Sequence, residues 1–274
     1  MRFQRIHEAI NHQPWFISPQ GYSSIRAIFE KASNRPAGAK EDWDEMLADF
    51  VRARPDMAFD VPTRTARIHI LGVVGPHLSV MEKSCGNTSY QDIVSEIERA
   101  KNLGAERINF IFDSPGGACM GCHEAAVAIA ALRDETSIFT VAFTDGMMCS
   151  AAYYLASGCN AIIATESAIV GNVGVILPWV DQSGMWAMLG LDFQPITSEG
   201  ADLKSAMHGP SLTESQRSFL QEGVNQIGAM FKNHVAENRG LALSDEVWRA
   251  GWYGGSDAVT LGLADLVADS AEAI

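Results

Sequence analysis

From Ala66 onward, runs of apolar and β-branched residues alternate with stretches of helical periodicity. Most runs have the length of one strand, and most are separated by a stretch long enough for a helix. The predicted strands are 66–75, 106–113, 137–143, 160–165, 172–177 and 192–198. The predicted helices are 88–102, 121–134, 149–158, 213–238 and 244–263. Such alternation indicates βαβ units, so the sequence predicts an α/β fold with a mainly parallel sheet flanked by helices.

Two of these helices begin at a recognisable capping signal. Thr88 is followed by Gln91, and Thr213 by Gln216, which is the spacing of a capping box. The sequence therefore predicts helix starts at Thr88 and Thr213.

The first 62 residues have a different character. Short helical patterns over about 21–32 and 41–53 are interrupted by prolines and by the loop-like segment SNRPAGAKED. We therefore expect residues 1–62 to form an accessory segment, helical and loop-rich, and residues 63–274 to form the main domain.

Charge and hydropathy exclude several classes of function. The net charge of −13 disfavours a nucleic-acid partner, because acidic surfaces repel phosphate backbones. No run approaches the roughly 20 apolar residues that span a bilayer, and no signal peptide is visible. The five cysteines are an odd number, which favours reduced thiols. We expect a cytoplasmic protein without a membrane span.

Asp113–Gly117 (DSPGG) is the first segment that could take part in a reaction. It follows a predicted strand and precedes a predicted helix. Two glycines allow a sharp turn with bare N–H groups near a helix N-terminus, where an anion or an oxyanion is stabilised. A plain strand-to-helix turn would need the same residues.

Ser150 is the second candidate, at the predicted start of a small apolar helix after the strand 137–143. A serine there is ordinarily an N-cap. It can also be a nucleophile whose oxyanion faces the N–H of Ala151 and the positive end of the helix. The residues around it do not form the G-x-S-x-G elbow, because position 148 is Met.

Lys204 is the third candidate, in the segment GADLKSA that follows the predicted strand 192–198. Its ordinary interpretation is a solvated loop lysine. A lysine acts as a general base only where burial or a neighbouring charge lowers its pKa from about 10.4 towards neutrality.

The order of these segments resembles the peptidase family of signal peptide peptidase A and the phage head maturation proteases, over about residues 65–270. The family's nucleophile segment, G-x-x-x-S-G-x-Y-x-x-A, is matched at Gly146, Ser150, Tyr153 and Ala156. Its lysine segment falls on Lys204, and its G-S-I-G-V strand on GNVGV at 171–175. Ala151 replaces the family's glycine after the nucleophile, and Asn172 replaces a serine that helps to position the lysine.

The resemblance implies the fold of ClpP and the crotonases, with repeated ββα units, and a Ser150–Lys204 dyad. ClpP has a histidine about 25 residues after its serine, where this chain has none. His208 is a weaker candidate base. The oxyanion donors would be the N–H groups of Gly117 or Gly116 and of Ala151. Gly171 and Asn172 would position the lysine or begin the strand that binds substrate.

We expect no cofactor and no metal. Cys119, Cys122 and His123 spell the C-x-x-C-H of attached haem, but that attachment occurs outside the cytoplasm. A zinc site would need two more ligands beside the C-x-x-C pair. Chance is the better explanation of this motif.

The expected function is a serine endopeptidase of phage or prophage head maturation, which cleaves scaffold, portal or capsid proteins. Relatives in which serine and lysine come from different subunits imply a homo-oligomer with composite sites. The scaffold region that some family members carry is expected to be separate from this sequence or missing from it. The alternatives are a cytoplasmic signal-peptide-peptidase-like protease, a crotonase-like acyl-CoA enzyme and a non-catalytic capsid assembly factor.

Overall fold

The structure is a computed structural model that describes residues 15–17, 55–79, 82, 83, 85–192, 194–205, 211–240 and 243–274. Its strands are β1 (Trp15–Ile17), β2 (Ala58–Asp60), β3 (Thr65–Gly75), β4 (Thr88–Ser89), β5 (Arg107–Ala118), β6 (Phe139–Cys149), β7 (Ala161–Ala164), β8 (Ile169–Gly171), β9 (Trp252–Tyr253) and β10 (Leu266–Val267). Its helices are α5 (Tyr90–Asn102), α6 (Cys122–Glu135), α7 (Ala151–Ala156), α8 (Ser183–Met188), α9 (Glu214–Arg239) and α10 (Gly255–Thr260), with short 3-10 helices η1 (Asp202–Ser205) and η2 (Val247–Arg249).

The strands of the described residues form one sheet with the central order β10–β7–β6–β5–β3–β2. β3, β5, β6, β7 and β10 pair with one another in parallel, and the short strands β1, β2 and β9 run antiparallel to their partners. The predicted fold class, an α/β fold with a mainly parallel sheet, is confirmed.

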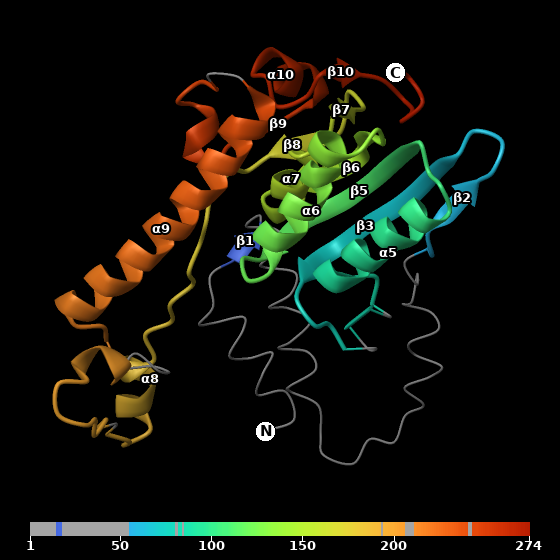
Figure 1. The fold of residues 1–274 in the computed structure, drawn as a ribbon. Helices are drawn as coiled ribbons and strands as arrows, with labels where there is room; N and C mark the ends of the chain where they lie inside the picture. Colours follow the sequence, from blue (N-terminus) through green and yellow to red (C-terminus); the bar gives the residue numbers. More distant parts are fainter. Residues whose placement is uncertain are drawn as a thin grey trace.

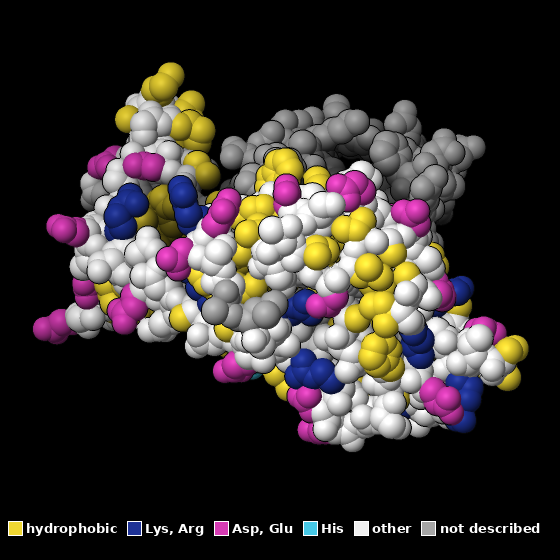
Figure 2. Space-filling view, turned by 90° about the horizontal axis from the view of Figure 1, so that it is seen from above, with side chains coloured by type: hydrophobic (Ala, Val, Ile, Leu, Met, Phe, Trp, Pro, Cys, Tyr) yellow, Lys and Arg dark blue, Asp and Glu magenta, His cyan; other side chains and the backbone are white. Residues whose placement is uncertain are grey.

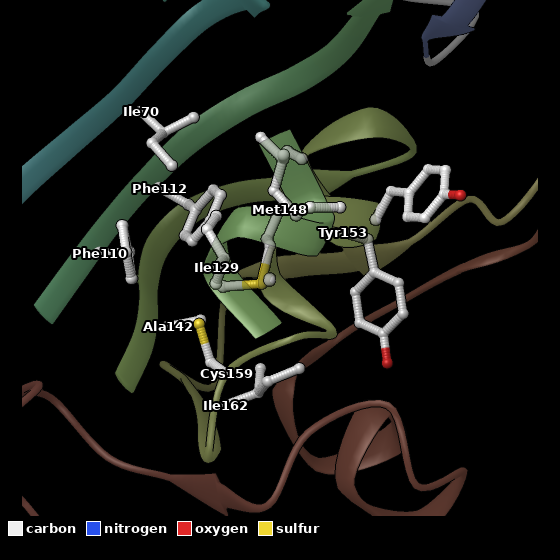
Figure 3. Close-up of a cluster of buried hydrophobic side chains, with 14 of the residues drawn as sticks. Ile70, Phe110, Phe112, Ile129, Ala142, Met148, Tyr153, Cys159 and Ile162 are labelled. Atoms are coloured by element: carbon white, nitrogen blue, oxygen red, sulfur yellow. The ribbon is translucent and has the colours of Figure 1, made fainter. Parts of the chain in front are cut away.

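The core lies between this sheet and the helices on one of its faces. α5, α6 and α7 lie side by side over β3, β5 and β6 in Figure 1. Figure 3 shows side chains of α6 and α7 against those of the strands, with Ile129 of α6 beside Phe112 and Tyr153 of α7 beside Met148. All four are fully buried. The central strands carry apolar side chains on both faces, as parallel strands do.

The opposite face of the sheet is covered in part by the C-terminal segment. Ala271 packs with Val141, Phe143 and Ile163 in a second buried cluster. Arg107 fastens this segment by donating to the carbonyl oxygens of Ala271, at 2.6 Å, and Ile274, at 2.8 Å.

The two predicted helix starts had different outcomes. Thr213 caps α9 with the full capping box to Gln216, as predicted. The N-cap of α5 is Ser89, not Thr88, because the Thr88 hydroxyl bonds the backbone N–H and C=O of Leu71 on β3. A long-range contact thus displaced the local signal by one residue.

Of the strand predictions that differ from the structure, three concern the candidate site and the arm. β5 continues through Asp113–Gly117 to Ala118, so this segment is strand and not a turn. Residues 172–175 have no regular structure, and the strand there is the earlier β8. The described residues of 192–198 form no strand, and Ile196 is 98% exposed.

Most of the expected accessory segment, including its helical patterns at 21–32 and 41–53, lies outside the described residues. Of residues 1–62, the structure describes 15–17 and 55–62. The proposed division into 1–62 and 63–274 therefore stays a prediction.

α9 extends well beyond the body of the domain (Figure 1). Its last turns are anchored there, because Phe231 and Val235 are buried and Arg239 pairs with Asp265 at 2.6 Å. No residue from Arg217 to Met230 is buried. We call the projecting part the arm: residues 177–192, 194–205 and 211–230. It contains α8 and η1.

The arm carries much exposed apolar surface. Figure 2 shows apolar side chains standing on the projecting part at the left, whereas acidic side chains are scattered over the whole face. The largest exposed side chains of the arm are Met185, Met188, Leu189, Leu191, Ile196 and Phe219, which are 51% to 98% exposed. Among the described helices, none is long and apolar enough to cross a membrane.

Candidate active site

Ser150 lies where β6 ends and α7 begins. β6 runs without a break to Cys149, and α7 starts at Ala151, so the reversal of direction falls on a single residue. Ser150 takes φ 56° and ψ −117°. This conformation is strained for a residue with a Cβ and is characteristic of functional sites. The turn thus has the geometry of a strand-to-helix nucleophile elbow although Met148 breaks the sequence motif.

Ser150 is the N-cap residue of α7 by position, but its side chain does not cap the helix. A capping serine has extended backbone and accepts an N–H bond from the first turn, and Ser150 does neither. Its own N–H donates to Gly171 O at 2.8 Å, and its carbonyl accepts from Tyr154 N at 2.8 Å. The hydroxyl lies 3.5 Å from Gly174 O, a long hydrogen bond. The backbone is therefore held firmly while the hydroxyl is held weakly.

Gly116 and Gly117 lie at the same end of the sheet as Ser150. Ser114 of β5 pairs with Met148 of β6, so Gly116 and Ser150 each follow this pair by two residues. Gly116 has φ 107°. A Cβ on Gly117 would lie 1.7 Å from Val74 O, so the close approach of β5 to β3 requires glycine here. Ala151, the first residue of α7, adds an N–H that has no acceptor within the helix.

Three residues to which the sequence assigned no individual role support this end of the sheet. Asp113 Oδ1 accepts from Met147 N at 3.2 Å and ties β5 to β6. A Cβ on Gly146 would lie 2.5 Å from the same oxygen, so Gly146 makes room for Asp113. The buried Ser114 Oγ accepts from Gly116 N at 3.2 Å. Asp113 and Ser114 belong to DSPGG, and Gly146 is the first residue of G-x-x-x-S. Membership of these two segments was the sequence signal that could have pointed to them.

Gly171 ends β8 and Asn172 follows it, beside Ser150, and their expected role with the lysine or the substrate strand stays a prediction. Gly171 supplies the carbonyl that accepts from Ser150 N. Asn172 has φ 57°, and its Nδ2 donates to Ala250 O at 2.9 Å. In the described residues this side chain holds the loop before β9 and makes no hydrogen bond to Lys204.

Lys204 lies in η1, exposed, on the arm. η1 is joined to the start of α9 by the bond from Gln216 Nε2 to Asp202 O, at 2.8 Å. Fifteen residues later Phe231 stacks on Tyr154 of α7, with ring centroids 4.6 Å apart. At 1.5 Å per residue, Gln216 and Phe231 lie about 20 Å apart along α9, so Lys204 is at the end of this span remote from α7.

A single chain therefore brings together Ser150, Ala151, Gly116, Gly117 and Gly171 but leaves Lys204 apart. His208, the weaker candidate base, lies outside the described residues. The hydroxyl of Ser150 has no carboxylate or imidazole hydrogen-bonded to it among the described residues.

The neighbouring thiols are poor nucleophiles. Burial raises the pKa of Cys149 to about 12 and the pKa of Cys122 to about 12, so both stay protonated at neutral pH. His123, the third member of the C-x-x-C-H motif, has its Nδ1 2.9 Å from Tyr154 Oη. Cys122 and His123 are the first residues of α6, and His123 contacts α7 there.

Comparison with known proteins connects this geometry to a family. The chain is 28% identical over 256 residues to the head-tail preconnector protein GP5 of Enterobacteria phage P21, across 93% of this chain and 50% of that one. It is 26% identical over 264 residues to the capsid assembly protease C of Escherichia phage lambda, across 95% of this chain and 60% of that one. A putative signal peptide peptidase SppA of Enterococcus faecium is 30% identical over 190 residues, or 68% of this chain and 54% of that one.

The chain thus spans about half to three fifths of the length of these relatives. Among solved structures, a point mutant of ClpP1 from Listeria monocytogenes matches with a TM-score of 0.45 and 12% identity, over 76% of this chain and 93% of that one.

The strongest of these findings concerns the region that holds the serine elbow and the arm. Residues 133–274, just over half of the chain, match the sequence profile of one family. This range includes Ser150, Gly171, Asn172 and Lys204. The chain belongs to peptidase family S49.

Proposed function

We propose that this protein is a serine endopeptidase with Ser150 as nucleophile. The observation that carries the proposal is the turn at Ser150, which is strained and is not capped by the serine side chain. Ser150 lies two residues after Met148 of β6, and Gly116 lies two residues after Ser114, the partner of Met148 on β5. Packing alone does not require a positive φ on a serine, and such strain persists where function uses it.

In the proposed reaction, neutral Lys204 takes the proton of Ser150 while Oγ attacks the peptide carbonyl. The N–H groups of Gly117 (or Gly116) and Ala151 stabilise the oxyanion. Collapse breaks the C–N bond, the ammonium of Lys204 returns the proton to the leaving amine, and an acyl-enzyme forms. Lys204 then activates water, which releases the acid and restores the serine.

Gly117 is the better oxyanion donor of the two glycines. The N–H of Gly116 already donates to Ser114 Oγ at 3.2 Å. Loss of one oxyanion donor raises the barrier by about 2.7–4 kcal/mol.

We further propose that Lys204 acts on Ser150 of a second copy of the chain. Within one chain the two residues are separated by much of the length of α9, and α9 is anchored to the body at its far end. The arm that carries Lys204 exposes large apolar side chains, including Met188 and Ile196. Burial of these side chains against another subunit is favourable, and it also desolvates the lysine.

The substrates that we propose are the proteins of an assembling phage head: scaffold, portal or capsid protein. The relatives named for head-tail connection and capsid assembly support this choice, because they match over more than nine tenths of the chain. The site of action would be the host cytoplasm and the prohead.

A fluorophosphonate probe tests the nucleophile and the base together. We expect covalent labelling of Ser150 in the wild-type chain, none in Ser150→Ala, and labelling slowed by about 1,000-fold or more in Lys204→Ala. Lys101→Ala, which removes an exposed lysine on α5, is the matched control and should label like the wild type.

A second assay follows cleavage of a scaffold or capsid protein by the same four proteins. Labelling that persists in Ser150→Ala would contradict the assigned nucleophile. Labelling without cleavage of these substrates would point to the signal-peptide-peptidase-like alternative. A serine that stays unlabelled in every form of the protein would favour the acyl-CoA enzyme or the assembly factor.

A further inference from the structure

The open edge of β5 beside Ser150 is occupied by a strand from the beginning of the same chain. β5 has β6 as its neighbour only as far as the pair Ser114–Met148. Beyond it, Cys149 of β6 pairs with Gly171 of β8, and β6 then turns at Ser150. The last residues of β5, Gly116–Ala118, are left without β6.

The other edge of these residues is already closed. Gly116 pairs with Val73, and Gly117 with Val74, both on β3. Because a strand has two edges, any further partner of Gly116–Ala118 must lie on the edge that β6 has left. That edge faces the elbow at Ser150.

β1 fills this edge. Trp15 pairs with Ala118, Phe16 with Gly117 and Ile17 with Gly116, in antiparallel register and without a bulge. Figure 1 shows β1 beside α6, at the opposite end of the sheet from β2, the strand that follows it in sequence. β1 therefore covers the three residues that contain the proposed oxyanion glycines.

A substrate peptide would need the same edge. Proteins that bind extended peptides commonly add them as a strand to an open sheet edge through main-chain hydrogen bonds. Here the carbonyl to be cleaved must lie between Ser150 Oγ and the N–H of Gly117. A peptide in that position runs along Gly116–Ala118, where β1 now lies.

The burial of Ser150 agrees with an occupied site. Ser150 and Ala151 are both 0% exposed. Part of the chain must therefore move before a peptide carbonyl reaches the hydroxyl.

We propose that Trp15–Ile17 is a self-inhibitory strand, an internal peptide ligand that holds the substrate-binding edge of β5 until it is displaced. The inhibitory effect rests on the proposed role of Ser150 as nucleophile. The occupancy of the edge does not, so the two can be tested separately.

A reversible cross-link tests the inhibition. In Trp15→Cys/Ala118→Cys, the new thiols are on directly paired residues, whose Cα separation of about 4.5–5.5 Å suits a disulfide. We expect the oxidised protein to label with fluorophosphonate about ten-fold or more slowly than the same protein after reduction. Each single-cysteine variant is compared with itself, oxidised and reduced, and should show no such difference.

Equal labelling of the cross-linked and reduced forms would overturn the proposal. So would failure of the two cysteines to cross-link under oxidation, as judged by mass spectrometry, because β1 would then not be paired with β5.

A binding measurement tests occupancy without any catalysis. Neighbouring residues of a strand direct their N–H groups to opposite edges, so either Phe16 or Ile17 directs its N–H to β5. The double variant Phe16→Pro/Ile17→Pro removes that N–H, whichever of the two residues carries it. Both proteins carry Ser150→Ala. A fluorescent peptide of residues 12–20 should bind the proline variant about ten-fold or more tightly than it binds the protein with an unchanged β1. Phe16→Ala/Ile17→Ala, which keeps the backbone donors, is the matched control and should show a smaller gain.

Equal affinity of the peptide for the proline variant and for the intact β1 would overturn the proposal. If no form of the protein is labelled at Ser150, the proposed function fails, whereas this binding result still decides whether β1 occupies the edge.

Discussion

Ser150 combines a reactive side-chain hydroxyl with a strained backbone conformation. Its φ of 56° is accessible to glycine at little cost and to serine only with strain of about 1–3 kcal/mol. The surrounding bonds to Gly171 O and Tyr154 N hold this conformation in place. The fold thus keeps this serine in a conformation that costs some stability.

Ser150→Gly should therefore stabilise the protein while abolishing labelling. We expect the free energy of unfolding to rise by about 1 kcal/mol, because relief of strain exceeds the entropy lost with glycine. Urea denaturation measures it. Ser157→Gly is the matched control, because Ser157 has φ −60° and its Oγ donates to Tyr154 O at 2.8 Å, so this change should lower stability. A destabilised Ser150→Gly would show that the turn is not strained.

His234 links the anchoring of α9 to pH. Burial, with smaller effects of His123 and Arg133, lowers the pKa of His234 from 6.5 to about 4. Its buried Nε2 has no hydrogen-bond partner among the described residues. The folded protein thus holds this imidazole neutral where the unfolded chain would protonate it.

Stability should fall as the pH is lowered from about 6.5 towards 4. In that window the unfolded chain binds the proton and the folded protein does not, so each step down in pH favours unfolding. Chemical denaturation at several pH values measures the slope. His234→Gln should flatten it, whereas His77→Gln, at an exposed position, should leave it unchanged. Equal slopes in the wild type and His234→Gln would contradict this assignment.

At the scale of elements, the most consequential contact is that of β5 with β3. It carries Gly116 and Gly117 past the point where the sequence predicted a turn. Local residues suggested a sharp turn at the two glycines. Pairing on both edges instead makes them the continuation of a central strand.

Gly117→Ala should destabilise the protein by about 3 kcal/mol or more, since its Cβ would meet Val74 O and neither backbone can withdraw easily. Thermal or urea denaturation measures the change. Gly223→Ala on α9 is the opposite case: no atom lies within 4 Å of the added Cβ, and the helix should gain up to about 1 kcal/mol. Similar effects of the two substitutions would contradict the close packing of β5 on β3.

The same scale explains the strand that was predicted wrongly at 192–198. The segment was predicted to be a strand, but its described residues lie on the arm, where Ile196 is 98% exposed. The pattern of apolar residues indicates that one face of a segment is suited to burial. It does not distinguish a domain core from a subunit interface.

At the scale of the whole molecule, the arm separates Lys204 from the elbow that it is proposed to serve. If each site takes its serine from one chain and its lysine from another, two inactive variants should complement. We expect Ser150→Ala and Lys204→Ala, unfolded and refolded together in equal amounts, to regain up to about a quarter of wild-type activity, because random pairing unites the intact residues in one site of four.

Peptide hydrolysis by the mixture measures this recovery, and Ser150→Ala refolded with Ser150→Ala/Lys204→Ala is the matched control, which contains no intact serine. A mixture as inactive as its components would contradict the shared site and favour a movement of α9 within one chain.

The sequence alone determined what depends on neighbouring residues. Alternating apolar runs predicted the parallel sheet, the Thr213 capping box predicted the start of α9, and the order of DSPGG, Ser150, GNVGV and Lys204 predicted the candidate site. The first two signals act over a few bonds or one helical turn, whereas the third is the order of segments along the chain, which resembles a known family.

The tertiary structure decided what depends on distant segments. Pairing with β3 made DSPGG a strand, the junction of β6 with α7 gave Ser150 its positive φ, and the anchoring of α9 placed Lys204 on an exposed arm. The pairing of Trp15–Ile17 with Gly116–Ala118 joins residues about 100 positions apart. No local pattern encodes such a contact, because it depends on which sheet edge the rest of the fold leaves open.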